Sequence, residues 1–283
     1  MAAARIASGY HGRVSRAQLL AAGVDPDRIK RWIRDGRLRP VHKGVYAVGH
    51  TAPSVLARYA GAVLASGDGA RLSHFADAHV LRLLKGPPPR PEVSVPTTAH
   101  RRRPGIIIRR VREIPAQDTG TLHGIPILSV ARTLLDLAAR LTAQQLTRAC
   151  HEAWHRHGTS PDDIERCIAR NPHKKGISKL RRALGADDVL SPLETGFLRL
   201  MCEYALPPPR TNIDVAGDKV DCHWPEHDLT VELHSYRFHA TRQAFENDIA
   251  RRRRSGHLPF SYGDVFDRGP QTAGEIASRL GLG

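Results

Sequence analysis

Two short helical patterns open the chain. A helix over residues 15–24 begins at Ser15, which suits an N-cap position. Its apolar side is formed by Leu19, Leu20 and Val24. Asp25 followed by Pro26 is a sharper start signal, for a second helix that ends at Gly36. The apolar stripe of this second helix is formed by Ile29, Trp32 and Ile33.

Two short strands follow around the turn His42-Lys43-Gly44. This order predicts a winged helix-turn-helix, in which the second helix enters the major groove of DNA and the hairpin touches the backbone. The cations that we expect on the DNA-binding surface are Arg28, Lys30, Arg31, Arg34, Arg37 and Lys43. The alternative is a small helical cap whose arginines are only solvated.

The middle of the chain mixes helical and strand patterns. Residues 53–66 and 73–84 suit helices, residues 92–96, 105–114 and 125–128 suit short strands, and a long apolar-periodic helical stretch follows. A turn at residues 100–105 carries three consecutive arginines that could grip phosphate, although a charged loop tip is usually just solvated. A basic connector, residues 173–187, leads to the last part of the chain.

The last hundred residues predict a helix followed by a hairpin. Ser191 and Glu194 form a capping box, and the helix should end before Pro207. Two strands with alternating apolar positions follow, and they place Asp221 and Glu232 at facing positions on one side of the hairpin. Two neighbouring carboxylates repel unless a cation or a proton lies between them, and such oxygen ligands suit Mg²⁺.

Together these patterns predict an α/β (α+β) chain in three parts. Residues 1–95 form a winged helix-turn-helix region, residues 96–186 a mixed strand and helix region, and residues 187–283 a small α/β domain. The formal net charge of +15 and a pI near 10.4 favour a polyanionic partner such as DNA. The first residues lack a secretory apolar core and no stretch suits a membrane span, so we expect a cytoplasmic protein with no membrane partner. The four cysteines are widely spaced, which favours reduced thiols.

Residues 5–50 resemble the winged-helix domain of AbiEi-type antitoxins from bacterial toxin–antitoxin systems. Residues 73–84 and 124–139 resemble segments that recur in the same proteins, so the resemblance covers about the first 140 residues. It implies a DNA-binding regulator, and it makes a cognate toxin a partner to be tested.

Residues 219–256 resemble the domain related to very-short-patch-repair endonucleases, within the PD-(D/E)XK nuclease superfamily. This second resemblance covers residues 187–268 and implies a restriction-endonuclease-like α/β fold. It matches Glu194 to the helix glutamate of the family, Asp221 and Glu232 to its metal ligands, and His239 to the histidine after the strand. The cations implied to contact phosphate are Arg242, Arg251 and Arg252.

The sequence departs from the nuclease pattern at His234, where most relatives carry an acid followed by glycine. Mismatch-repair relatives have a histidine there and a second one five residues later, which His234 and His239 reproduce. The change therefore either preserves the chemistry through imidazole or marks a decayed site. If the site is active, Mg²⁺ would polarise the phosphate and a histidine would transfer the proton.

A separate motif, residues 151–155, satisfies the HExxH pattern of zinc proteases. No third ligand with suitable spacing follows it, so we expect ordinary helix packing there. The sequence leaves two functional hypotheses. One is an Mg²⁺-dependent DNA endonuclease guided by the first domain, and the alternative is a non-catalytic DNA-binding regulator of antitoxin type.

Overall fold

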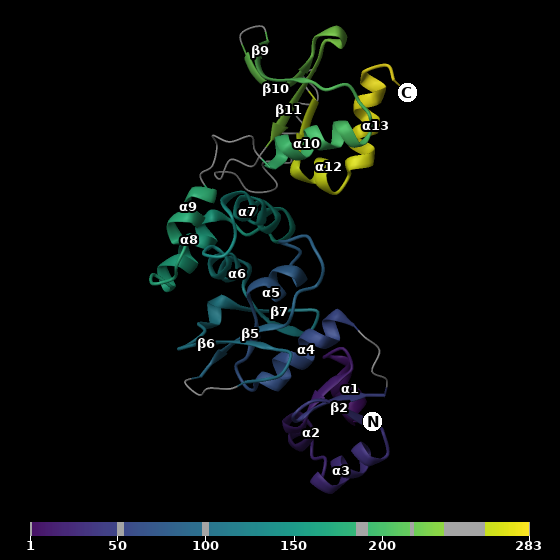
Figure 1. Ribbon diagram of the computed structural model, residues 1–283, viewed down its shortest axis with the longest axis vertical. Coiled ribbons are helices and arrows are strands. Elements are labelled where there is room, and N and C mark those ends of the chain that lie inside the picture. The colour runs from purple at the N-terminus through teal and green to yellow at the C-terminus, as the bar shows by residue number, and fades with distance from the viewer. Residues whose placement is uncertain are drawn as a thin grey trace. The chain divides into compact units, whose positions relative to one another are not determined.

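The computed structural model describes residues 2–49, 54–97, 102–184, 192–215, 218–234 and 258–282. The chain divides into two compact units, each described by itself (Figure 1). Unit 1 comprises Met1–Ala149 and Asp162–Leu180, and unit 2 comprises Cys150–Pro161 and Arg181–Gly283. The division into three domains that the sequence suggested stays a prediction.

Unit 1 opens with the predicted winged helix-turn-helix order of helices and strands. The elements are α1 (Ala2–Ser8), β1 (Arg13–Ser15), α2 (Arg16–Ala21), α3 (Pro26–Arg34), β2 (Leu38–His42) and β3 (Val45–Val48). The strands form an antiparallel sheet in the order β1-β3-β2. The residues of the predicted apolar stripes pack in the core beneath this sheet. Leu20 is the exception, since it is 37 % exposed. The mixed α/β class and the winged-helix region are confirmed.

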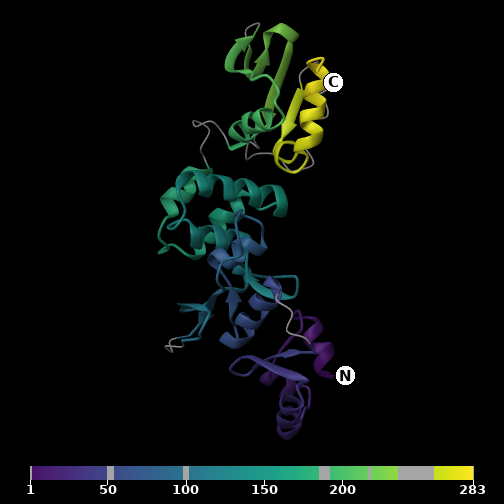
Figure 2. The ribbon, with the colours of Figure 1, turned by 45° about the vertical axis from the view of Figure 1, so that its right-hand side comes forward.

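The rest of unit 1 is built on a five-stranded sheet in the order β6-β5-β4-β8-β7. Its strands are β4 (Arg71–Leu72), β5 (Glu92–Pro96), β6 (Ile107–Val111), β7 (Thr119–Leu122) and β8 (Ile125–Leu128). Its helices are α4 (Val55–Ser66), α5 (His74–Val80), α6 (Val130–Leu137) and α8 (Pro161–Arg170). Two further helices, α7 (Ala143–His157) and α9 (Ile177–Leu184), begin in unit 1 and end in residues assigned to unit 2. The long helical pattern is thus two helices, α6 and α7, and the basic connector contains α9. In Figure 2, α3 lies at the tip of unit 1, away from α8 and α9.

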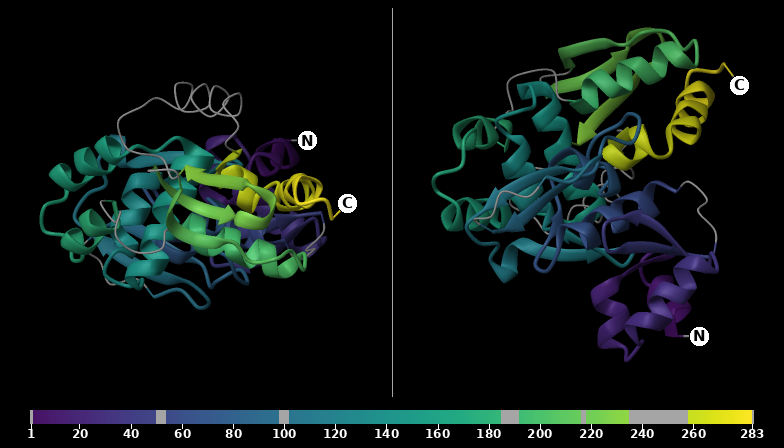
Figure 3. Two further views of the ribbon diagram at one scale, coloured as in Figure 1. Left: turned by 90° about the horizontal axis from the view of Figure 1, so that it is seen from above. Right: turned by 60° about the horizontal axis from the view of Figure 1, so that its bottom comes forward.

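Unit 2 has a helix, three antiparallel strands, and then a fourth strand parallel to the third. The elements are α10 (Pro192–Glu203), β9 (Arg210–Val215), β10 (Asp218–Trp224), β11 (Leu229–His234), β12 (Leu258–Ser261), α12 (Tyr262–Phe266) and α13 (Gly269–Arg279). The strand order is β12-β11-β10-β9, with only the β11–β12 pair parallel. Helices α10 and α13 pack beside this sheet (Figure 3), around Phe197, Trp224 and Phe260.

No helix in the described ranges is long and apolar enough to cross a membrane. All four cysteines are free thiols, as the sequence predicted.

Candidate nucleic-acid interface and the carboxylates of unit 2

Helix α3 is fixed at its start by side-chain capping and along its length by burial. The Asp25 carboxylate accepts hydrogen bonds from the backbone N–H groups of Asp27 and Arg28, at 2.7 and 3.3 Å. Ile29 is buried, and Trp32 packs against the same core. One face of the helix is therefore committed to the core, and the other face carries its charged residues into solvent.

The four predicted cations of α3 are all exposed, but they differ in their partners. Lys30 donates to Asp27 at 2.9 Å, and this hydrogen bond and charge lower the pKa of the Asp27 carboxyl. The Arg28 guanidinium lies 5.6 Å from the centre of the Trp32 ring, in cation–π geometry. Arg34 lies 3.7 Å from Asp35. Arg31 forms no ion pair in the described chain, although its charge also lowers the pKa of Asp27, so it is the α3 cation least held by a direct contact.

The hairpin of β2 and β3, which we call the wing, lies beside the start of α2. Lys43 is exposed at the turn between β2 and β3, and Gly44 adopts a φ of 75°, which favours glycine. The carbonyl of Gly44 accepts a hydrogen bond of 2.8 Å from the backbone N–H of Arg16. Arg37, which precedes β2, is also exposed. The cations predicted to contact DNA thus lie on α3, just before β2 and at the tip of the wing.

In unit 2, the predicted carboxylates come from neighbouring elements. Pairing of Cys222 with Val231 and of His223 with Thr230 places Asp221 opposite the middle of β11. The Asp221 carboxylate accepts a hydrogen bond of 2.6 Å from the backbone N–H of Leu233.

Glu194 of α10 lies near the same part of the sheet. Burial together with the charges of Asp221 and Glu194 raises the pKa of the Cys222 thiol to about 12. Asp221 and Glu194 therefore both lie close to Cys222, and Glu232 lies on the strand that Asp221 contacts. All three carboxylates are only partly buried.

The remaining predicted residues of this site cannot be placed. The His234 side chain and the residues His239, Arg242, Arg251 and Arg252 lie outside the described residues. Among the residues that are described, no group of three or more His, Cys, Asp or Glu side chains could hold a metal ion. Their proposed roles stay predictions.

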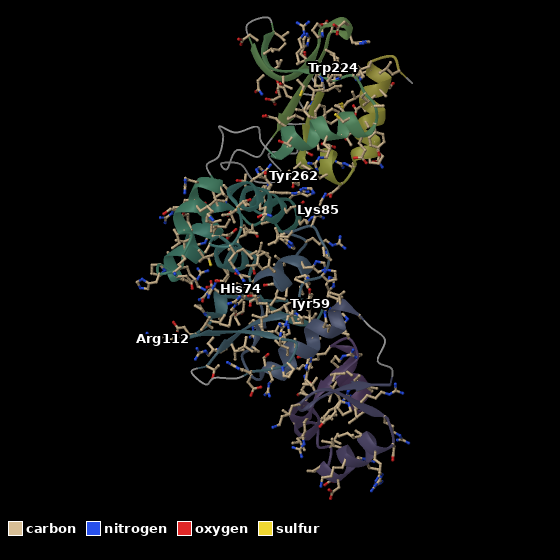
Figure 4. The ribbon with its side chains drawn as sticks, viewed as in Figure 1. Tyr59, His74, Lys85, Arg112, Trp224 and Tyr262 are labelled. Carbon is tan, nitrogen blue, oxygen red and sulfur yellow. The ribbon has the colours of Figure 1, made fainter. Side chains whose placement is uncertain are left out.

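The HExxH motif contributes to packing within unit 2. The His151 ring stacks on Tyr262, which Figure 4 labels, with ring centres 5.7 Å apart, and burial lowers the pKa of His151 to about 4. His155 lies 2.6 Å from Asp267, and Glu152 accepts hydrogen bonds from Tyr262 and Arg156. The motif therefore contacts α12 and the residue after it, as the packing interpretation predicted.

Unit 1 holds an ion-pair network that we did not predict from the sequence. Arg132 is only 2 % exposed, and its guanidinium donates to Asp118 at 2.9 Å and to Asp136 at 3.2 Å. Asp118 is also bonded by Asn171 and Arg170. Burial raises the pKa of Asp118, but hydrogen bonds from Asn171, Arg170 and Arg132 outweigh it and hold that pKa below the usual value. The sequence signal was an Arg and an Asp four residues apart inside an otherwise apolar helix.

Two family models match the chain. Residues 1–49 match the model described as transcriptional regulator, AbiEi antitoxin, and residues 75–186 match the AbiEi antitoxin C-terminal domain. These two regions are therefore similar to AbiEi antitoxin domains. The winged-helix region and most of the five-stranded sheet with its helices fall within the matched residues.

Neither match extends beyond residue 186, and no curated protein matches the sequence. Among solved structures, the chain is similar to the RV2827C protein from Mycobacterium tuberculosis. The two are 19 % identical with a TM-score of 0.41, over 65 % of this chain and 76 % of that one.

Proposed function

We propose that the protein is a DNA-binding transcriptional regulator of the antitoxin type. The observation that carries this proposal is the winged-helix order of elements with an α3 whose outer face presents arginines, within a region that matches an antitoxin regulator model. The second matched domain supports a cognate toxin as the protein partner. Growth of cells that express the product of the neighbouring gene, with and without this chain, tests the toxin partner.

DNA binding is tested by fluorescence anisotropy with a duplex from the region upstream of the gene, over a range of salt concentrations. Counterion release predicts that the logarithm of affinity falls linearly with the logarithm of salt, by about 0.9 per phosphate contact. Arg31→Ala should weaken binding, because the exposed Arg31 forms no ion pair that holds its side chain away from DNA. Arg279→Ala, an equal loss of charge on α13 of unit 2, is the matched control. An affinity that is independent of salt would contradict the proposal.

A second candidate function is metal-dependent DNA cleavage by unit 2. Two observations favour it. A helix is followed by three antiparallel strands and a fourth strand parallel to the third, and Asp221 lies opposite the strand that carries Glu232. The donor set is oxygen-rich and partly exposed, which fits Mg²⁺, and Asp221 and Glu232 would hold it. The ion would polarise a phosphate and lower the pKa of a bound water.

In this candidate mechanism, His234 or His239 would accept the proton from the attacking water, and Arg242, Arg251 and Arg252 would neutralise phosphate charge. The test is plasmid cleavage with Mg²⁺ or Mn²⁺ by the wild type and by Asp221→Asn. The asparagine keeps an oxygen that can accept the Leu233 N–H, so the fold is preserved while the carboxylate charge is lost. Asp214→Asn, on the exposed side of β9, is the control. Cleavage by Asp221→Asn at the wild-type rate would exclude this candidate.

A further inference from the structure

Three basic side chains that are distant in the sequence converge on α4, behind the wing. A Cβ atom placed on Gly61 of α4 would lie 3.7 Å from the ring of His42 and 3.8 Å from the side chain of Arg13. One turn further along α4, the carbonyl of Ala65 accepts a hydrogen bond of 3.1 Å from the guanidinium of Arg103. The site lies on the helix that carries Tyr59, which Figure 4 labels.

These three basic side chains form no ion pair with an acid in the parts of the chain that the structure describes. Arg13 is 8 % exposed, and its guanidinium makes only a long hydrogen bond, 3.4 Å, to the carbonyl of the preceding Gly12. Arg132 of the same unit is similarly buried but is bonded to two aspartates. Arg13 is thus a largely buried residue whose charge is not matched by an ion pair among the described residues, and a bound anion would supply that match.

The local electrostatics agree with this geometry. Burial, the charge of Arg103 and the charge of Arg13 all lower the pKa of His42, so the imidazole stays neutral while the site is without an anion. Burial also lowers the pKa of Arg13. A bound anion would oppose both pKa shifts, because its charge would favour the charged form of each neighbouring base.

We propose that Arg13, His42 and Arg103 form a phosphate-binding site between the β1-β3-β2 sheet and α4. Two guanidinium groups present several N–H donors in the planar arrangement that matches phosphate oxygens, and imidazole adds another donor. Because β2 leads from His42 directly into the wing turn, the phosphate comes either from the DNA backbone beside the wing or from a free phosphate compound. The two sources share one chemistry and are separated by experiment.

The first arm measures inorganic phosphate binding to the full chain by isothermal titration calorimetry, with ionic strength held constant by chloride. We expect a single saturable site. Arg103→Ala should lower the affinity at least tenfold, and Arg102→Ala should leave it unchanged. Arg102 is the matched control because it is the adjacent exposed arginine. Equal losses in the two variants, or no saturable binding by the wild type, would overturn a site for free phosphate.

The second arm measures duplex DNA affinity against salt for the same variants. If the phosphate belongs to DNA, Arg103→Ala should reduce the salt slope by about 0.9, and Arg102→Ala should not. Loss of inorganic phosphate binding with an unchanged slope assigns the site to a free compound. If Arg103→Ala alters neither readout, the proposal is wrong. Because the first arm needs no DNA, this outcome is distinguishable from a failure of the regulator to bind DNA.

Arg13→Met supplies the readout that a purely structural role would not give. Methionine keeps the apolar stem of the side chain and removes the charge. We expect the melting temperature in phosphate-free buffer to stay the same or rise, and the stabilisation by phosphate to disappear. At ten times the dissociation constant, that stabilisation of the wild type should be roughly 3–6 °C. A melting temperature that falls equally with and without phosphate would contradict the proposal.

Discussion

Replacement of Arg132 by methionine tests whether the buried ion-pair network holds unit 1 together. The guanidinium of Arg132 donates to Asp118, Asp136 and Asn171, at distances of 2.8 to 3.2 Å. Its removal leaves two buried carboxylates without a central cation. Breaking a buried pair in this way typically costs about 3–5 kcal/mol, because the remaining charge has lost its compensation.

The bonds that remain in the network after the substitution place the expected loss of stability at the lower end of that range. Asp118 keeps two bonds from Arg170, and Asp136 keeps Lys174. We therefore expect Arg132→Met to lower the free energy of unfolding by about 3 kcal/mol. Arg170→Met should lower it by only about 1 kcal/mol, because the Arg170 side chain is 31 % exposed and Asp118 keeps Arg132.

Native-state hydrogen exchange of the α6 amides, measured in urea, reports this local free energy directly. Arg166→Met is the control, because Arg166 pairs with Asp163 on the surface and its loss should change the value by less than about 0.5 kcal/mol. If Arg132→Met cost no more than Arg170→Met, the network would not be the stabilising element that its burial implies.

Four further predictions concern single positions. Gly61→Ala should raise the free energy of unfolding of unit 1 by about 0.5–1 kcal/mol in urea denaturation, because the helix gains alanine and the nearest atoms lie at 3.7 Å. Gly196→Ala should lower that of unit 2 by about 1–3 kcal/mol, because its Cβ would clash with Phe266. Asp118 has a lowered pKa, so its contribution is present above pH 4 and should be lost as pH falls below that, and Asp118→Asn should flatten this acid limb of the stability profile. Asp77 is fully buried and its pKa is raised well above the usual value, so its contribution is lost as pH rises above about 4, and Asp77→Asn should stabilise unit 1 more at pH 7 than at pH 4.5.

Local signals sufficed for the winged-helix region. The capping box of Ser15 with Gln18 and the N-cap of Asp25 act within three residues of chain, so the start of each helix could be predicted correctly. Leu20 was predicted on the apolar side of its helix and is exposed, because α2 is too short to bury a wide stripe. The long helical stretch expected after residue 128 consists of two helices, because periodicity alone does not locate the break between α6 and α7.

The candidate sites depend more on contacts between segments that are distant in the sequence. Alternation along β10 and β11 correctly placed Asp221 near the strand of Glu232, because hairpin partners are close in sequence. The parallel partner β12 joins β11 after a gap of 23 residues, and no local pattern predicted that pairing. The network around Arg132 was missed because its partners lie up to 39 residues away.

The sequence by itself determined the helix caps, the strand alternation, the cations of α3 and the antitoxin resemblance, since each depends on residues a few positions apart. Only the tertiary structure decided which charges are compensated. Arg132 meets two carboxylates and Arg13 meets none among the described residues, although both are largely buried arginines. Whether a buried charge has a partner depends on side chains that the fold brings together from distant segments, as it does for Arg13 and Arg103, which lie ninety positions apart.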